Sequence, residues 1–256
     1  MTQTTRASVA VAIPAYQAAA SVGEIVRRTR AVLPDAEVLV VDDGSTDDTS
    51  EVAGAAGARV LRLSVNRGKG RALATAFADL FARGAEAVVT LDADGQHLPE
   101  EIPRLLAAWE RPDGAGRRPD LVLGDRRRLF AAMGAVRRTS NRWSSLVISS
   151  LAGQPLADVQ SGFRLYARRL IESVGFPEAR FEAESAVVVR AVRGGFRVLA
   201  VPVRLGFADG TSTSHYRPLA DSVRIGLAVA RVRLEARREA GGPWHPSDGW
   251  TREPSS

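Results

Sequence analysis

The chain lacks cysteine altogether, which excludes disulfide bonds and thiolate metal sites. Aromatic residues are also few, 6% of 256 residues, and none of them alternate with the basic clusters. Proteins that bind single-stranded nucleic acid usually interleave aromatic with basic side chains. The net charge of +6 therefore does not by itself indicate a nucleic-acid partner, and we expect none. Lys69 is the only lysine of the chain. The many arginines have guanidinium groups that suit phosphate binding.

Long apolar runs are missing too. No stretch approaches the roughly 18 to 20 residues that a membrane-spanning helix requires. The first seven residues are polar and no apolar signal segment follows them, so the sequence predicts no secretory signal. We therefore expect a cytoplasmic protein, either soluble or peripheral at the inner face of the plasma membrane.

What the chain does have is a hydrophobic fraction of 45% and a regular alternation of apolar strands with helices. We expect strands at 9–13, 38–41, 60–64, 87–91 and 121–124, and helices at 18–33, 46–56, 71–83 and 99–109. After residue 126 the alternation stops, and the later expected elements are helices at 139–151 and 184–193 and a strand at 198–203. This order predicts one α/β domain with a mostly parallel sheet and right-handed crossovers.

Two of the expected strands run directly into pairs of acidic residues. Asp42 and Asp43 follow one strand, and Asp92 and Asp94 follow another. Ligands of open parallel sheets bind just outside the carboxyl ends of the strands, so both pairs fall where a site is expected. Because Asp92 and Asp94 are two residues apart, both carboxylates can turn toward one hard cation that bridges phosphate oxygens.

These motifs also have purely structural interpretations. Acidic residues after a strand often only begin the next helix, which accounts for Asp47 and Asp48. The glycine-rich run at 66–71 lacks the required positions of a Walker loop and of a dinucleotide-binding loop. It is either a tight strand-to-helix turn or a place where Lys69 touches a nucleotide.

Five short segments follow one another in order between residues 9 and 205. They are Ile13-Pro14-Ala15-Tyr16-Gln17, Val40-Val41-Asp42-Asp43-Gly44-Ser45-Thr46-Asp47, Asn66-Arg67-Gly68-Lys69-Gly70, Leu91-Asp92-Ala93-Asp94-Gly95-Gln96-His97-Leu98-Pro99-Glu100 and Asp158-Val159-Gln160-Ser161-Gly162-Phe163-Arg164. As a set they resemble the family 2 glycosyltransferases with a GT-A fold, in the branch of dolichyl-phosphate and polyprenyl-phosphate sugar synthases. The resemblance implies a Rossmann-like sheet, a nucleotide-sugar donor and a polyprenyl phosphate acceptor.

The resemblance and the local patterns together assign an expected role to each matching position. The expected nucleotide-binding residues are Pro14, Tyr16, Asp42, Asp43, Lys69, Asp92 and Ala93. The expected ligands of Mg²⁺ or Mn²⁺ are Asp92, Asp94 and Gln96. The residues expected to meet the acceptor or its phosphate are Arg126, Ser161, Arg164 and His215. The expected catalytic residues are Arg164 and Asp158, the latter as base.

Some positions leave alternatives open. Gln17 and Ala18 stand where many relatives have Asn and Glu, which removes a carboxylate that could bind guanine, so UDP is favoured no less than GDP. His97 is either part of the turn before the next helix or in contact with the site. Glu182 and Glu184 either pair with nearby arginines or take part in chemistry.

The C-terminal part divides by composition. We expect the catalytic domain to span 1–218, an amphipathic helix to span 219–240 and a disordered tail to span 241–256. The helix combines an apolar stripe with arginines, the pattern of a helix that lies on a membrane surface, although the same stripe also suits packing on the domain.

The function expected from the sequence is an inverting, metal-dependent transfer of a sugar from a nucleotide sugar to a polyprenyl phosphate. The alternative within the class is transfer to a glycan or small-molecule hydroxyl, with Asp158 as base. From other classes, the alternatives are a non-catalytic nucleotide-sugar-binding protein and a nucleotidyltransferase.

Overall fold

The computed structural model describes residues 8–126, 161–180 and 182–206. In these residues seven strands form one sheet with the order β3-β2-β1-β4-β6-β5-β7. The strands are β1 (Val9–Ala15), β2 (Val38–Asp42), β3 (Arg59–Arg62), β4 (Ala87–Thr90), β5 (Leu121–Asp125), β6 (Arg164–Ala167) and β7 (Val198–Pro202). The helices are α1 (Val22–Val32), α2 (Thr49–Ala55), α3 (Lys69–Ala82), the 3₁₀ turn η1 (Pro99–Glu101), α4 (Ile102–Glu110), α6 (Arg168–Val174) and α7 (Glu182–Arg193).

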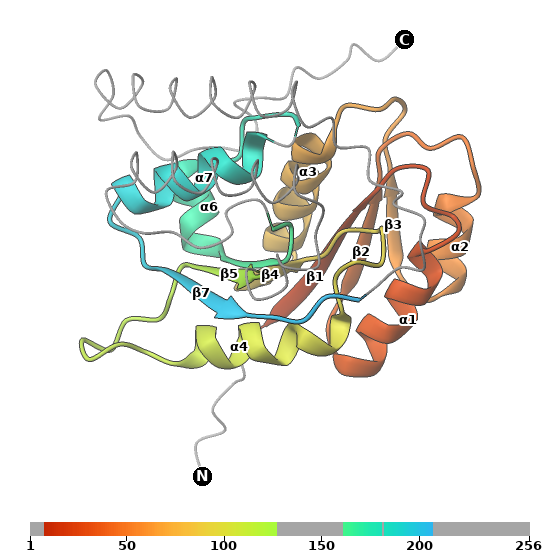
Figure 1. Ribbon diagram of the computed structural model, residues 1–256. Coiled ribbons are helices and arrows are strands. Elements are labelled where there is room, and N and C mark those ends of the chain that lie inside the picture. Colours follow the sequence, from red (N-terminus) through yellow and green to blue (C-terminus); the bar gives the residue numbers. More distant parts are fainter. Residues whose placement is uncertain (1–7, 127–160, 181, 207–256) are drawn as a thin grey trace, which may run out of the picture.

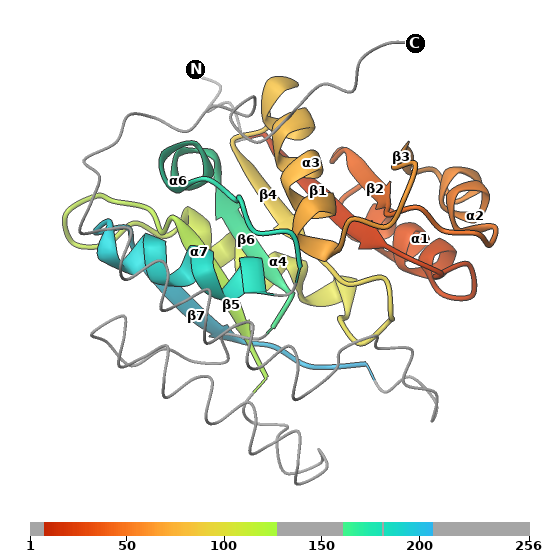
Figure 2. The same ribbon diagram turned by 90° about the horizontal axis from the view of Figure 1, so that it is seen from above.

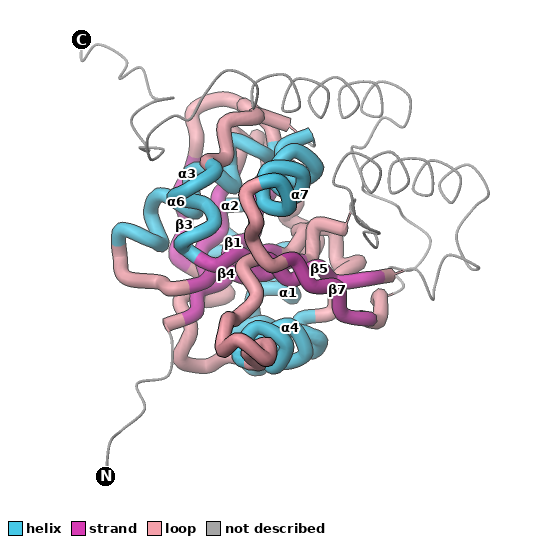
Figure 3. Tube along the Cα trace, turned by 90° about the vertical axis from the view of Figure 1, so that its left-hand side faces the viewer, coloured by secondary structure: helices cyan, strands magenta, loops and turns pink. Residues whose placement is uncertain are grey.

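Helices cover both faces of the sheet. Successive residues of β1 point to opposite sides, as a strand requires, so Ala10 and Ala12 join one core and Val11 and Ile13 join the other. The first core contains residues of α3, α6 and α7, and the second contains residues of α1, α2 and α4. Figure 1 shows α4 and α1 beneath the sheet, Figure 2 looks onto the face covered by α3, α6 and α7, and Figure 3 shows the layers from the side.

The strand directions bring the ends of several strands to one edge. β1 pairs in parallel with β2 and β4, and β5 pairs in parallel with β7. Of the described strands, β6 alone runs antiparallel to its neighbours, with Arg164 opposite Thr90 on β4 and opposite Leu123 on β5. The start of β6 therefore lies beside the carboxyl ends of β4 and β5, where ligands of such sheets bind.

The prediction of a mostly parallel α/β sheet is confirmed, with shifts of a few residues at most element ends. The first helix begins at Val22 rather than at 18, and the helix expected at 99–109 divides into η1 and α4. The sequence did not predict β6 or α6. No helix within the described residues is both long enough and apolar enough to cross a bilayer.

Several expectations lie outside the described residues. These are the helix at 139–151, the catalytic base Asp158, the phosphate contact His215, the amphipathic helix at 219–240 and the tail at 241–256. They stay predictions from the sequence.

Candidate active site

The carboxylate of Asp92 lies among charged side chains at the carboxyl end of β4. The ammonium nitrogen of Lys69, the first residue of α3, is 2.6 Å from Asp92 Oδ1. The same nitrogen is 2.8 Å from Oε2 of Glu184, in the first turn of α7. Segments that are far apart in the chain thus place two carboxylates on one ammonium group.

Burial and charge together set the protonation of this group. Burial is the largest single effect and raises the pKa of Asp92, but the charge and hydrogen bond of Lys69, together with His97 and Arg126, outweigh it and hold that pKa at about 2. Burial opposes the charge on Lys69, yet Asp92 and Glu184 raise the pKa of the lysine above its ordinary value. At neutral pH, Asp92 is therefore ionised and Lys69 is charged.

Asp94 lies two residues further along, in the loop between β4 and η1. Its Oδ1 accepts a hydrogen bond of 3.0 Å from the main-chain N–H of Gln96. Burial, followed by the negative charge of Asp92, raises the pKa of Asp94 above its ordinary value. Ala93, which lies between Asp92 and Asp94 in the chain, is buried, and its carbonyl accepts a hydrogen bond from the hydroxyl of Ser21. The repulsion between Asp92 and Asp94 is the kind that a bound cation relieves.

The donor set fits a hard divalent cation that also binds a phosphorylated ligand. Within residues 8–126, 161–180 and 182–206, no three or more acidic or histidine side chains are arranged to enclose a metal ion. Mg²⁺ in particular is usually held by one or two carboxylates, with substrate phosphates and water completing its shell. Asp92 and Asp94 supply those two carboxylates.

The segment just before β6 packs directly on the ion pair. A Cβ on Gly162 would lie 2.6 Å from both Asp92 Oδ2 and Lys69 Nζ. The main-chain oxygen of Gly162 also accepts a hydrogen bond of 2.8 Å from the hydroxyl of Thr90 at the end of β4. A larger residue here would therefore have to displace the ends of the Asp92 and Lys69 side chains, and the pair is enclosed on this side.

Arg126 and Arg164 both belong to this region but face different surroundings. Arg126 follows β5, and its positive charge acts to lower the pKa of both Asp92 and Asp94. Arg164 is fully buried, and its guanidinium donates to the main-chain oxygens of Ser161, at 2.6 Å, and Glu184. These contacts give Arg164 a structural role, and its contact with the acceptor phosphate stays a prediction. Ser161 is likewise fully buried.

The glycine-rich run at 66–71 is shaped by packing. A Cβ on Gly70 would lie 2.4 Å from the main-chain oxygen of Glu178, which precedes α7. A Cβ on Gly68, whose φ is +95°, would lie 2.6 Å from the oxygen of Ala179. The run is thus a tight turn against the segment before α7, and it also directs Lys69 into the site.

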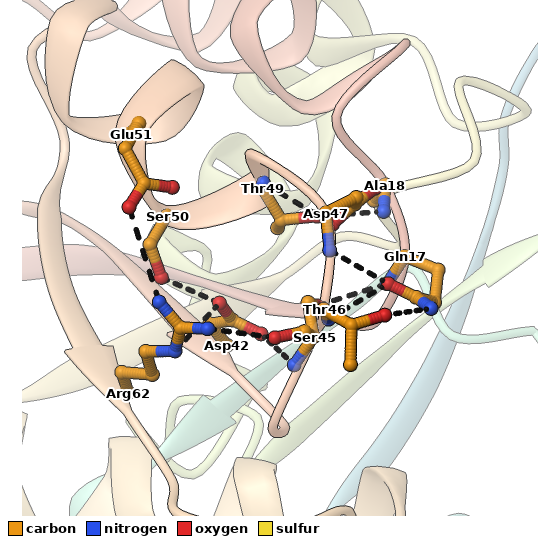
Figure 4. A network of polar contacts seen from close by, with 10 residues as sticks. All are labelled: Gln17, Ala18, Asp42, Ser45, Thr46, Asp47, Thr49, Ser50, Glu51 and Arg62. Carbon is orange, nitrogen blue, oxygen red and sulfur yellow. Dashed lines mark hydrogen bonds and ion pairs between the residues drawn. The ribbon is translucent and has the colours of Figure 1, made fainter.

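The loops after β1 and β2 are joined by side-chain hydrogen bonds (Figure 4). Gln17 has a left-handed backbone, φ 51°, and its Oε1 accepts hydrogen bonds from the N–H groups of Thr46 and Asp47. Asp47 accepts from the N–H groups of Ala19 and Thr49. Gln17 therefore holds the loops after β1 and β2 together.

The acidic pair after β2 is buried in its own loops. Asp42 is fully buried and accepts hydrogen bonds from the N–H of Ser45, at 2.8 Å, and the hydroxyl of Ser50. Asp43 accepts from the N–H groups of Arg67, at 2.8 Å, and Gly68, at 2.7 Å. Burial raises the pKa of Asp43, against the effect of these two donors. Both carboxylates order the loops, and their direct contact with a nucleoside stays a prediction.

Two large apolar side chains are exposed on either side of this pair. Pro14 is half-buried near the end of β1, Tyr16 just after it is 37% exposed, and Val65, after β3, is 55% exposed. A hollow between the loop after β2 and the end of β3 is lined by residues 44–46 and 62–64. Val65 was not singled out from the sequence, because one valine in a turn carries no distinctive pattern.

His97 lies in the segment between β4 and η1, as expected, and it is buried and in contact with Asp92. Its Nδ1 accepts a hydrogen bond of 3.2 Å from the N–H of Asp92, and its ring stacks on Phe163 with centroids 5.5 Å apart. The ring therefore supports the main chain that carries Asp92. Of the two alternatives for Glu184, pairing with an arginine is not seen among the described residues, where its carboxylate pairs with the ammonium of Lys69.

Comparison with known proteins gives the following relatives. Residues 10–175 match the sequence model of "Glycosyl transferase family 2". The undecaprenyl-phosphate mannosyltransferase of Micrococcus luteus is 32% identical over 241 residues, 88% of this chain and 96% of the relative. The polyprenol monophosphomannose synthase of Mycolicibacterium smegmatis is 31% identical over 210 residues, 75% of each chain. A crystal structure of glucosyl-3-phosphoglycerate synthase from Mycobacterium tuberculosis with Mn²⁺, UDP and phosphoglyceric acid superimposes with a TM-score of 0.68 at 22% identity, over 90% of this chain and 78% of that one.

Proposed function

The chain belongs to glycosyl transferase family 2 and is a glycosyltransferase, and from this we propose that it moves a sugar from a nucleotide sugar to a polyprenyl phosphate, with inversion and with a divalent cation. The two relatives of known acceptor are named for transfer to polyprenyl phosphates. Membership of an enzyme family also removes the non-catalytic binding protein and the nucleotidyltransferase as alternatives.

The observation that carries the proposal is the charge arrangement at the carboxyl end of β4. Asp92 and Asp94 present two carboxylates, while Lys69 and Arg126 bring positive charge to the same place. A nucleoside diphosphate bound through a cation needs both kinds of group, because the metal uses carboxylates and the remaining phosphate charge uses cationic side chains.

The nucleoside is proposed to lie next to the diphosphate, over the loops after β1 and β3. Tyr16 and Val65 provide exposed apolar surface there, and Pro14 lies near the end of β1 beside them. Asp42 and Asp43 are proposed to act on the nucleoside mainly by ordering these loops, since their oxygens already accept main-chain hydrogen bonds.

The reaction needs little base catalysis when the acceptor is a phosphate monoester. Its second pKa is about 6, so it is already an ionised nucleophile at neutral pH. An acceptor phosphate oxygen forms a bond to the anomeric carbon, and the bond from that carbon to the β-phosphate oxygen breaks. The nucleoside diphosphate leaves with the electron pair, and attack opposite the leaving group inverts the configuration.

The side chains of the site are proposed to hold the leaving group and to orient the acceptor. When bound by Asp92 and Asp94, with Gln96 nearby, Mg²⁺ or Mn²⁺ supplies charge neutralisation for the departing diphosphate. Lys69 and Arg126 add positive charge to the same groups. Outside the described residues, His215 is proposed as a phosphate contact, and Asp158 would be needed as base only with a hydroxyl acceptor.

One experiment tests the proposal directly. The purified protein is given UDP- and GDP-sugars, a polyprenyl phosphate and Mn²⁺ or Mg²⁺, and the products are identified by mass spectrometry. The expected product is a glycosyl polyprenyl phosphate that does not form with the unphosphorylated polyprenol. Equal transfer to the unphosphorylated alcohol, or transfer only to a soluble hydroxyl compound, would replace this proposal with the hydroxyl acceptor and Asp158 as base.

A further inference from the structure

Glu184 stands out among the buried charged groups because its contacts are divided. Its side chain is 7% exposed, and Oε2 lies 2.8 Å from the ammonium of Lys69. Its other carboxylate oxygen, Oε1, is buried and accepts no hydrogen bond from any described residue. A carboxylate buried in this way is costly unless it is paired, so the contact with Lys69 is what compensates its charge.

Lys69 has a second carboxylate partner that has another task. Asp92 Oδ1 lies 2.6 Å from the same ammonium, yet Asp92 is also one of the two carboxylates suited to a divalent cation. A cation bound to Asp92 competes with the Lys69 ammonium for this oxygen, because both positive groups would bind the same lone pairs of the carboxylate. When a cation and a diphosphate occupy the site, Glu184 is a partner that can still hold the lysine.

We propose that Glu184 is a positioning residue that keeps the Lys69 ammonium at the place of the donor diphosphate while Asp92 turns to the cation. This inference rests on one part of the proposed function, namely that the donor is a nucleoside diphosphate sugar. Lys69 begins α3 and Glu184 lies in the first turn of α7, so two helices on one face of the sheet fix the pair. Gly162 also packs against the pair, because a Cβ there would lie 2.6 Å from the same ammonium nitrogen.

A purely structural role for Glu184 would depend on its main-chain oxygen and not on its carboxylate. The contact from Arg164 goes to the main-chain oxygen of Glu184 and not to its carboxylate. Glu184→Gln keeps that oxygen and the side-chain shape, and it removes the charge facing Lys69. Glu182 lies in the same first turn, is partly exposed, and accepts a hydrogen bond from the N–H of Arg180. Glu182→Gln is therefore a matched control for the charge at the helix end.

The test compares ligands with and without the second phosphate. Binding of UDP and UMP, and of GDP and GMP, is measured by calorimetry in the presence of Mn²⁺ for the full chain and its variants. Glu184→Gln is expected to weaken binding of the preferred diphosphate about tenfold, the loss of one charge-assisted contact. The monophosphate of the same nucleoside is expected to change by less than about twofold, and Glu182→Gln to change neither.

A double-mutant cycle identifies Lys69 as the group through which Glu184 acts. Lys69→Met is expected to give the same selective loss for the diphosphate, and adding Glu184→Gln to it should cause no further loss. Equal loss for monophosphate and diphosphate, the same loss in Glu182→Gln, or a full additional loss in the double variant would overturn the proposal. If Glu184→Gln does not fold, unchanged diphosphate binding by Lys69→Met overturns it instead.

The outcome is separable from that of the proposed function. Transfer by the wild-type protein to a polyprenyl phosphate is measured in parallel. A selective loss of diphosphate binding without such transfer would support the role of Glu184 and refute the proposal of a polyprenyl phosphate acceptor. Transfer without the selective loss would support that acceptor and refute the role of Glu184.

Discussion

Replacing Gly162 with alanine adds one methyl group at the most crowded point of the site. The new Cβ would lie 2.6 Å from Asp92 Oδ2, 2.6 Å from Lys69 Nζ and 2.8 Å from Asp92 Oδ1. These separations are far below ordinary contact distances. The backbone of Gly162 is outside the left-handed region, so alanine causes no conformational strain and the effect is purely steric.

The neighbouring groups have little freedom to move away. Lys69 is held by Glu184 at 2.8 Å, and the main chain of Asp92 is held by His97 at 3.2 Å. Added volume in a well-packed place costs about 1–3 kcal/mol. In a chain of this size each kcal/mol lowers the melting temperature by about 2–4 °C. We therefore expect Gly162→Ala to lower the melting temperature by about 2–12 °C.

The same variant should weaken donor binding, because the methyl group displaces the Asp92 carboxylate and the Lys69 ammonium from the places where they would meet the cation and the diphosphate. Differential scanning calorimetry measures stability, and titration with a nucleoside diphosphate and Mn²⁺ measures binding. Gly114→Ala is the control, since a Cβ there meets no atom within 4 Å, and a change below about 0.5 kcal/mol is expected. Wild-type melting temperature and affinity in Gly162→Ala would refute the idea that close approach fixes the ion pair.

Four further outcomes are expected. Asp92→Asn and Asp94→Asn should each abolish metal-stimulated transfer while the variants stay folded, and full activity of both variants in excess EDTA would contradict this. Although burial opposes it, hydrogen bonds from Thr49 and Ala19 lower the pKa of Asp47, so its stabilising effect is present above about pH 4 and is lost as the pH falls through the lowered value. Denaturation of Asp47→Asn should accordingly show a deficit at pH 7 that shrinks below about pH 4. Arg164→Ala should cost about 3–5 kcal/mol in urea denaturation by emptying a buried charged site, and unchanged stability would contradict its structural role. Deleting the predicted helix at 219–240 together with the tail should reduce flotation with anionic liposomes, whereas equal flotation would show that the helix only packs on the domain.

The sequence predicted those parts of the fold that depend on local pattern. β2 and β4 are short apolar runs that end at acidic residues, and the alternation of strands with amphipathic helices was enough to predict a mostly parallel sheet. It failed at β6 and α6, where Arg164, Arg168 and Arg169 occur within a few residues. Arginine usually marks solvent-exposed positions, and only a buried set of carbonyl partners makes Arg164 an interior residue.

For the site, the sequence located the residues but not their partners. It placed Asp92 and Asp94 at the end of a strand, and it marked Lys69 as a possible contact. It did not pair Lys69 with Glu184, and it did not show that Asp42 and Asp43 accept hydrogen bonds from main-chain N–H groups of the loops around them. A carboxylate can accept hydrogen bonds either from a ligand or from the N–H groups of a nearby loop, and the residue pattern in the sequence is the same in both cases.

By itself, the sequence determined the order of strands and helices from β1 to β5 and the edge of the sheet where the acidic residues gather, because periodicity and strand ends are local properties. The tertiary structure alone decided that α3 and α7 meet at Asp92, and that the segment before β6 closes over the ion pair. That outcome depends on inserting the antiparallel β6 between β4 and β5 and on packing two helices on one face of the sheet. Such contacts join residues far apart in the chain, and their energy comes from burial and charge pairing that no local pattern records.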